Sequence, residues 1–267
     1  MTMDVKSICR EVISISKETG EFIRKEGQGF KQEYIESKGI HDYVSYVDKE
    51  AEDRLVEKLG MLLPEAGFIA EEGSGDKNQG GLNWVIDPLD GTTNFIHGLP
   101  PFSVSIALVE HRKPLLGVVY EINLDECFYS WQGAPAYLNE KEIRVSQTAM
   151  VKDSLIATGF PYTDFKHMSP FIRSFEYLME NSHGLRRLGS AAVDLAYVAC
   201  GRFDAFYEYG LKAWDVAAGV FIVKQAGGSV SDFAGGEDFL FGGELVASNA
   251  KVFNEFQSAV RHFMKPD

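Results

Sequence analysis

Apolar residues recur along this chain with two different spacings. Residues 4–26 carry an apolar stripe every three to four positions with charges opposite, and residues 49–63 repeat the pattern up to Pro64. This spacing predicts amphipathic helices, and Asp48 is the expected N-cap of the second one. The same reasoning predicts helices near 168–181, 190–201 and 213–226, and a last helix over 250–264.

Short apolar runs separated by polar turns predict strands in between. A strand or extended hairpin is expected over 34–48, a short strand at 67–70, and an antiparallel meander from 102 to 146. Further strands are expected near 203–208, 228–233 and 244–248. The mixture predicts two α/β lobes packed as one unit, residues 1–150 and 151–267, with a soft boundary near 145–155.

In the stretch NWVIDPLDGTTNFIHGLP, residues 83–100, an apolar run is followed by two aspartates, Asp87 and Asp90. By itself, Asp-Pro-Leu-Asp-Gly is also a plausible surface β-turn. If DGTTNF begins a helix, however, Asp90 lies near its N-cap, and the amides of Gly91 and Thr92 are unpaired donors. Such donors, together with the helix dipole, bind an anion such as phosphate.

At four places along the chain, acidic residues follow the end of an apolar segment. These are Glu71-Glu72, Asp87, Asp90 and Asp215. Clustered carboxylates repel one another unless they take up protons or a cation, and hard oxygen ligands without His or Cys suit Mg²⁺. Taken singly, Glu71-Glu72 fits a solvated loop and Asp215 fits a helix cap, but one metal site explains all four places.

The composition narrows the class of protein. The net charge of −13 and pI near 5.0 argue against non-specific nucleic-acid binding. No apolar stretch reaches the roughly 20 residues of a membrane span, and the charged N-terminus lacks a signal-peptide core. The three scattered cysteines fit reduced, packed thiols, so a cytoplasmic protein is expected.

Other chemistry has little support. The six histidines lack metal-ligand spacing, His97 included, and Ser74 lacks the G-x-S-x-G elbow of serine hydrolases. Arg186 and Arg187 could clamp a phosphate, but a subunit contact or a solvated turn explains them more simply. Asp194 and Asp204 fit structural roles.

Several of these motifs resemble the inositol monophosphatase family, part of the Mg²⁺-dependent, lithium-sensitive phosphatase superfamily. WVIDPLDGTTNF and AWDVAAGVFIVKQAGGSVSDFAGG match its two signatures. GFIAEEG supplies the acidic pair, and LRRLGSAAVDLAYVACGRFDAFYEYGL the substrate-side segment. The resemblance, which runs from about Lys38 to Asn249, implies an α+β fold, a layered α-β-α-β-α sandwich of the sugar phosphatase type. It also implies a homodimer.

The resemblance implies Mg²⁺ as cofactor, with ligands from three stretches: Glu71, Glu72, Asp87, the Leu89 carbonyl, Asp90 and Asp215. Asp87 is then shared between two ions, Asp90 and Asp215 complete the second, and a further weak ion lies near Glu71 and Glu72. The implied catalytic residues are Glu71, Thr92 and Asp90.

The remaining implied roles concern the substrate. Phosphate is expected on the amides of Gly91 and Thr92. The hydroxyls of a sugar-like alcohol are expected at Glu208 and at backbone groups around Gly189 and Ala191, and Lys38 and Asp48 are supporting residues. One departure affects those two, since DYVSYVD stands where the family usually has a sequence close to DLVTxxD.

The expected activity is Mg²⁺-dependent hydrolysis of a phosphomonoester by a metal-activated water, with myo-inositol 1-phosphate as leading substrate. Thr93-Asn94-Phe95 resembles the inositol phosphate type, and a carboxylate at Glu208 can accept hydrogen bonds from vicinal hydroxyls. Fructose-1,6-bisphosphatase and 3′(2′),5′-bisphosphate nucleotidase activities remain alternatives. A non-catalytic partner protein that uses the metal site as a switch is a further one.

Overall fold

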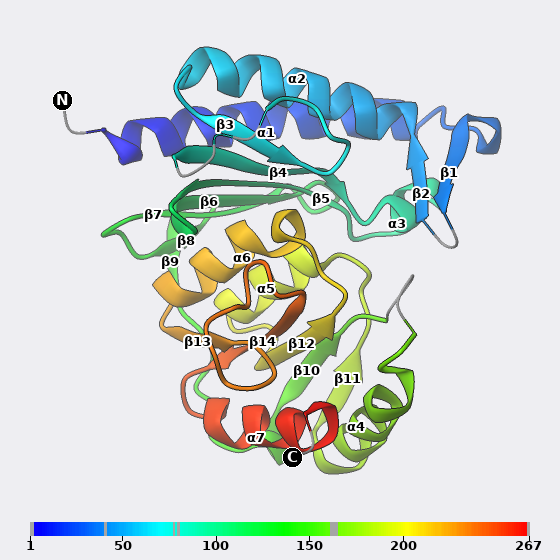
Figure 1. The fold of residues 1–267 in the computed structure, drawn as a ribbon, viewed down its shortest axis with the longest axis vertical. Helices are drawn as coiled ribbons and strands as arrows, with labels where there is room; N and C mark the ends of the chain where they lie inside the picture. Colours follow the sequence, from blue (N-terminus) through cyan, green and yellow to red (C-terminus); the bar gives the residue numbers. More distant parts are fainter. Residues whose placement is uncertain (1–2, 40–41, 77, 79–80, 161–164, 266–267) are drawn as a thin grey trace.

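Helices and sheets alternate in five layers in the computed structural model, which describes residues 3–39, 42–76, 78, 81–160 and 165–265 (Figure 1). Helices α1 (Val5–Gly27) and α2 (Tyr46–Leu62) cover one face of a seven-stranded sheet. Helices α5 (Ala191–Ala199) and α6 (Ala213–Gln225) lie between that sheet and a five-stranded one. Helices α4 (Met168–Asn181) and α7 (Phe253–Met264) cover the outer face. The layered α-β-α-β-α prediction is confirmed.

The seven-stranded sheet has the order β3-β4-β5-β6-β7-β8-β9. Only the β3–β4 pair is parallel, and the others form an antiparallel meander, as the alternating runs predict. The strands are β3 (Gly67–Ala70), β4 (Leu82–Asp90), β5 (Ser103–Glu110), β6 (Lys113–Glu121), β7 (Glu126–Trp131), β8 (Ala136–Leu138) and β9 (Lys141–Ile143).

The five-stranded sheet has the order β11-β10-β12-β14-β13. Its strands are β10 (Leu155–Thr158), β11 (Gly184–Arg186), β12 (Ala205–Tyr209), β13 (Gly228–Ser231) and β14 (Glu244–Asn249). Strand β10 pairs in parallel with both β11 and β12, whereas β14 is antiparallel to β12 and β13. A separate hairpin joins β1 (Ile35–Gly39) to β2 (Asp42–Ser45), and the short helix α3 (Thr92–Ile96) follows β4.

Apolar side chains fill each interface between layers. One cluster joins α1 and α2 to the seven-stranded sheet and includes Val12, Leu55 and Trp84. A second joins both sheets through α5 and α6, and a third packs α4 and α7 on the five-stranded sheet. Burying apolar area at about 25 cal/mol per Å² is the main force that holds these layers together.

The start of α2 differs from the prediction. Ser45, not Asp48, is the N-cap, and its side chain accepts a hydrogen bond from the Val47 amide. Asp48 is the third helical residue and accepts hydrogen bonds from the amide (2.8 Å) and hydroxyl (2.6 Å) of Ser45. This capping box fixes the Asp48 side chain on the inner face of the helix, 1% exposed.

A search of the described residues finds no helix long and apolar enough to cross a membrane.

Candidate active site

The four predicted acidic places converge because of strand register. Strands β3 and β4 run in parallel with Ala70 opposite Ile86, so the next residues, Glu71 and Asp87, leave the pair side by side. The Glu71 amide donates to the Ile86 carbonyl at 3.3 Å. Strand β4 continues to Asp90, and Asp87 and Asp90 are both buried. The alternative of a surface β-turn at Asp-Pro-Leu-Asp-Gly is therefore wrong.

Helix α6 brings Asp215 to the same place from the layer between the sheets. Ser105, the β5 partner of Asp87, donates its hydroxyl to the Trp214 carbonyl at 3.3 Å. Asp215 Oδ2 accepts the Lys212 amide at 2.6 Å. Lys212 is the N-cap of α6, and Asp215, its third residue, helps to cap the helix by accepting the Lys212 amide, as one interpretation of the sequence held. Asp215 also adjoins the other carboxylates.

These carboxylates raise one another's pKa. Burial, followed by repulsion from Glu71, Asp90 and Asp215, raises the pKa of Asp87 well above its usual range. Burial and the charge of Asp90 raise the pKa of Asp215 to about 7. Burial also raises the pKa of Asp90 to about 6, although hydrogen bonds to its carboxylate and the positive charge of Arg187 act to lower this pKa. A cation among these groups would relieve the repulsion.

The donor set fits Mg²⁺. One oxygen of each aspartate is held by a protein donor: Asp87 Oδ1 by the Leu89 amide (3.0 Å), Asp90 Oδ2 by Ser190 and Ala192, and Asp215 Oδ2 by Lys212. With one oxygen fixed, each carboxylate is oriented before a cation binds. Within the described part of the chain, no three His, Cys, Asp or Glu side chains stand in metal-binding geometry, so the fit to Mg²⁺ rests on the chemistry and orientation of these carboxylates.

Gly91 makes the turn from β4 into α3. Its φ is +98°, a left-handed conformation that glycine adopts without strain. A Cβ there would lie 3.0 Å from the Pro101 carbonyl oxygen and 3.3 Å from that of Gly189, so the backbones approach closely. Gly91 is the N-cap of α3, and no side chain caps it. The predicted phosphate-binding residues, Gly91 and Thr92, therefore lie at the end of β4.

The Thr92 hydroxyl lies 2.9 Å from Asp48 Oδ1 and 3.0 Å from the Leu89 carbonyl. Both neighbours are acceptors, so the single hydroxyl proton is directed toward them and the oxygen lone pairs face away. Burial raises the pKa of Asp48, while hydrogen bonds from Ser45 and Thr92 oppose the rise. Asp48 is thus placed to hold the Thr92 hydroxyl, and its supporting role in the site stays a prediction.

The start of α5 lies against Asp90 and forms another side of the candidate site. Ser190 Oγ donates to Asp90 Oδ2 at 2.6 Å, and the Ala192 amide donates to the same oxygen at 2.7 Å. Asn94 of α3 donates to the carbonyls of Leu188 and Pro101, both at 2.8 Å. These bonds hold the predicted Gly189 and Ala191 backbone groups beside the turn at Gly91.

Glu208 lies at the end of β12, half-buried. Burial, then repulsion from Asp215, raises its pKa well above the usual range, and the positive charge of Arg187 counteracts this. Burial, then repulsion from Glu208 and Asp90, raises the pKa of Asp194 in α5, and among the described residues no group hydrogen-bonds to its Oδ1. Glu208 is therefore close to the carboxylate cluster, on the side of α5.

One residue that supports the candidate site escaped the sequence analysis, and one of the two simpler interpretations of Arg187, a solvated turn, was wrong, while a subunit contact stays a prediction. Glu52 of α2 is fully buried and accepts the amides of Glu72 (2.7 Å) and Ser74 (2.8 Å), which holds the loop after Glu71. Arg187 is half-buried beside the acidic groups, and not in a solvated turn, whereas Arg186 is exposed. No local pattern marks Glu52, because its partners lie 20 and 22 residues away.

The supporting hairpin is described in part. Lys38 lies on β1, but its side chain is outside the described part of the chain. The departure at DYVSYVD has a structural counterpart at Tyr46. Its ring stacks on Phe30 with centroids 6.5 Å apart and meets Tyr34 edge-on at 5.5 Å, and its hydroxyl donates to Glu26. This aromatic contact ties the base of the hairpin to the end of α1.

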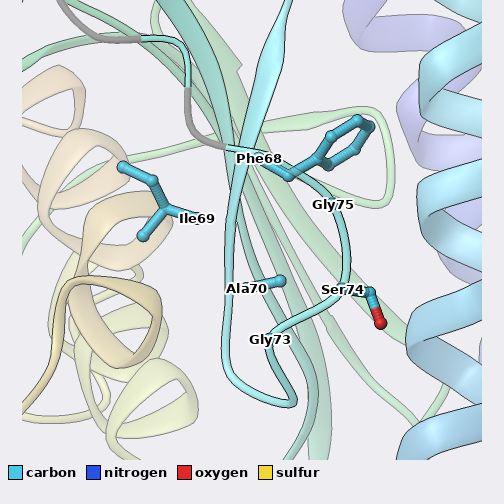
Figure 2. Close-up of a pocket in the computed structure, with 6 residues that line it drawn as sticks. All are labelled: Phe68, Ile69, Ala70, Gly73, Ser74 and Gly75. Carbon is cyan, nitrogen blue, oxygen red and sulfur yellow. The ribbon is translucent and has the colours of Figure 1, made fainter.

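A cavity of about 190 Å³ lies under the loop that Glu52 holds. It is lined by Phe68, Ile69, Ala70, Gly73, Ser74 and Gly75 (Figure 2). In this view Phe68 points toward α1 and α2, and Ile69 points the opposite way, toward α6. None of the lining residues is a predicted site residue, so the cavity adjoins the site without forming it.

Comparisons with known proteins agree with this geometry. The sequence model of the inositol monophosphatase family matches residues 4–264. An inositol-1-monophosphatase of Mesorhizobium japonicum is 42% identical and aligns over 85% of this chain and 86% of its own length. The Nus factor SuhB of Haemophilus influenzae is 41% identical over 93% of this chain and 94% of its own length.

A solved structure gives the same result. The extragenic suppressor protein suhB of Bartonella henselae superposes with a TM-score of 0.89 at 35% identity and covers 96% of this chain and 98% of its own. The fold, the motifs and the sequence identity over most of the chain lead to one conclusion. The chain belongs to the inositol monophosphatase family.

Proposed function

We propose that this protein is a Mg²⁺-dependent phosphomonoesterase that hydrolyses a small cyclitol or sugar phosphate. The observation that carries the proposal is the convergence of Glu71, Asp87, Asp90 and Asp215 beside the Gly91–Thr92 turn. Among the substrates of the family, myo-inositol 1-phosphate fits best, because Glu208 offers a carboxylate to vicinal hydroxyls.

Mg²⁺ would be held by Glu71, Asp87, the Leu89 carbonyl, Asp90 and Asp215, with Glu72 near a weaker ion. When bound, Mg²⁺ supplies charge that stabilises the phosphate oxygens and makes a nearby water more acidic. Gly91 and Thr92 would donate their amides to the phosphate.

The chain's own groups then serve the displacement. The Thr92 hydroxyl donates its hydrogen bond to Asp48 or to the Leu89 carbonyl, so its oxygen would accept a hydrogen bond from the attacking water. The Glu71 carboxylate, beside Asp87, would take up the proton that the water loses. The water oxygen would bond to phosphorus as the bond between phosphorus and the ester oxygen breaks, and the ester oxygen would take a proton from a solvent water and leave as the alcohol.

The test is phosphate release from a panel of esters, with and without Mg²⁺ and with added Li⁺. The panel contains inositol 1-phosphate, fructose 1,6-bisphosphate, 3′-phosphoadenosine 5′-phosphate and histidinol phosphate. We expect Mg²⁺-dependent turnover that is highest on the inositol ester and is inhibited by Li⁺. A different preferred ester would keep the phosphatase and replace the substrate, and no turnover on any ester would refute the proposal.

The relatives named Nus factor SuhB support a second candidate, a partner-binding role in which the metal site acts as a switch for assembly. A homodimer, implied by the family, would be compatible with both roles. An acidic chain of net charge −13 favours a protein partner over non-specific nucleic acid. Mg²⁺-dependent partner binding by a protein inactive on the whole panel would favour this second role.

A further inference from the structure

Gly159 lies directly against the carboxylate of Glu208. A Cβ built on Gly159 would overlap the carboxyl carbon and both carboxyl oxygens of Glu208, and these are the three nearest atoms that it would meet. The carboxylate therefore occupies the space that any other residue at position 159 would fill with its side chain.

The register of the five-stranded sheet explains this contact. Strands β10 and β12 are parallel, and their last recorded pair is Thr158 with Tyr207. Thr158 also donates its hydroxyl to the Tyr207 carbonyl at 2.7 Å, which fixes the two strands at that point. Gly159 directly follows the last residue of β10, and Glu208 is the next residue of β12, where it is still paired with Leu245 of β14. Gly159 and Glu208 therefore lie side by side at this end of β10.

Three charged groups lie near the Glu208 carboxylate. Asp215 and Asp90 raise its pKa, and Arg187 lowers it. Near these charges, the carboxylate occupies the space that Gly159 leaves. If a side chain at position 159 displaced the Glu208 carboxylate from that space, the carboxylate would lie differently relative to the candidate site at Asp90 and Asp215.

We propose that Gly159 is a specificity-determining residue, because its missing side chain seats the Glu208 carboxylate where it meets the hydroxyls of a polyol phosphate. The inference rests on the proposed function. Gly159 touches no substrate itself and acts by positioning Glu208.

The test compares Gly159→Ala, Glu208→Ala and the double variant with the wild type on two esters. Inositol 1-phosphate carries ring hydroxyls, and phenyl phosphate carries none. We expect the ratio of kcat/KM for the inositol ester to that for phenyl phosphate to fall about tenfold or more in Gly159→Ala, chiefly through KM. In the Glu208→Ala background the same change should alter the ratio less than about twofold, because the overlapping atoms are gone.

Gly184→Ala is the matched control. Gly184 begins the neighbouring strand β11, and a Cβ there would make ordinary contacts at 3.5 Å and 3.7 Å. The ratio of the two kcat/KM values in Gly184→Ala should equal that of the wild type. A wild-type ratio in folded Gly159→Ala, or an equal fall in the Glu208→Ala background, would overturn the inference.

Two further results separate the possible failures. If Gly159→Ala does not fold, Glu208→Asp withdraws the carboxylate from Gly159 without adding an atom, and a wild-type ratio in that variant would overturn the inference. A wild-type protein inactive on both esters would refute the proposed function, and the specificity role would be lost with it.

Discussion

The hydroxyl group of Thr92 shows how single residues are prepared for their task. Asp48 and the Leu89 carbonyl are the acceptors for its hydrogen bond, and Asp48 is itself held by two hydrogen bonds from Ser45. The site predicted from the motif is thus supported by a capping box that the sequence analysis assigned differently. Asp48, expected both to begin α2 and to support the site, is the third residue of that helix and accepts a hydrogen bond from the Thr92 hydroxyl.

Thr92→Val removes that hydroxyl while it keeps the branched shape of the side chain. We expect kcat for phosphate release to fall about 100-fold with little change in KM, because the variant loses a contact to the attacking water and none to the alcohol. Steady-state kinetics measure the effect. Thr93→Val, at the next position of α3, is the control, and an equal loss in both variants would contradict the role of Thr92.

Elements determine which distant residues meet, and helix α2 is the clearest case. It packs on β4 and presents the buried Glu52 to the loop that follows β3. The two amides that Glu52 accepts belong to Glu72 and Ser74, directly after the predicted ligand Glu71. The helix thus fixes the loop that carries one side of the proposed metal site.

Glu52→Gln leaves one oxygen acceptor for two amide donors. We expect the Mg²⁺ concentration for half-maximal activity to rise about 10- to 100-fold, as for other groups that hold metal ligands in place. Stability should fall by about 1.5–3 kcal/mol. Glu50→Gln is the control, since Glu50 lies on the exposed face of α2 and pairs with Arg54. Equal Mg²⁺ dependence in both variants would contradict the role of Glu52.

The sequence predicted the bounds of helices and strands better than it predicted the contacts between them. Periodicity located α4 at its observed bounds, and α5, α6 and β14 within about two residues, because each has a continuous apolar face. The three-residue strand β11 escaped because it is too short for a pattern. The contacts of Asn94, Arg187 and Ser190 escaped for another reason, since they depend on partners about 90 residues away or more.

At the scale of the whole molecule, the predicted metal ligands come from different layers. Glu71, Asp87 and Asp90 belong to the seven-stranded sheet, and Asp215 belongs to α6 between the sheets. A bound Mg²⁺ would therefore link two layers that otherwise meet through apolar packing and a few hydrogen bonds.

Removal of Mg²⁺ should consequently lower the stability of the whole chain. At free Mg²⁺ about 100 times its Kd, binding adds about 2.7 kcal/mol, which corresponds to a rise in Tm of roughly 5–10 °C for a chain of this size. Thermal unfolding in EDTA and in Mg²⁺ measures the difference. Asp215→Asn should show a smaller rise, and an equal Tm in EDTA and Mg²⁺ for the wild type would argue against the site.

The central claim is that these carboxylates form a Mg²⁺ site that hydrolyses a phosphate ester, and Asp90→Asn tests it most directly. The measurement is phosphate release from inositol 1-phosphate against Mg²⁺ concentration for wild type, Asp90→Asn and the exposed control Asp153→Asn. We predict Mg²⁺-dependent release by the wild type and the control, and at least about a 100-fold loss in Asp90→Asn, because a neutral amide replaces a carboxylate of the cluster. The amide oxygen introduced at this position can still accept a hydrogen bond from Ser190 or Ala192, so the fold should survive. Normal release by Asp90→Asn, or release by the wild type without Mg²⁺, would contradict the account.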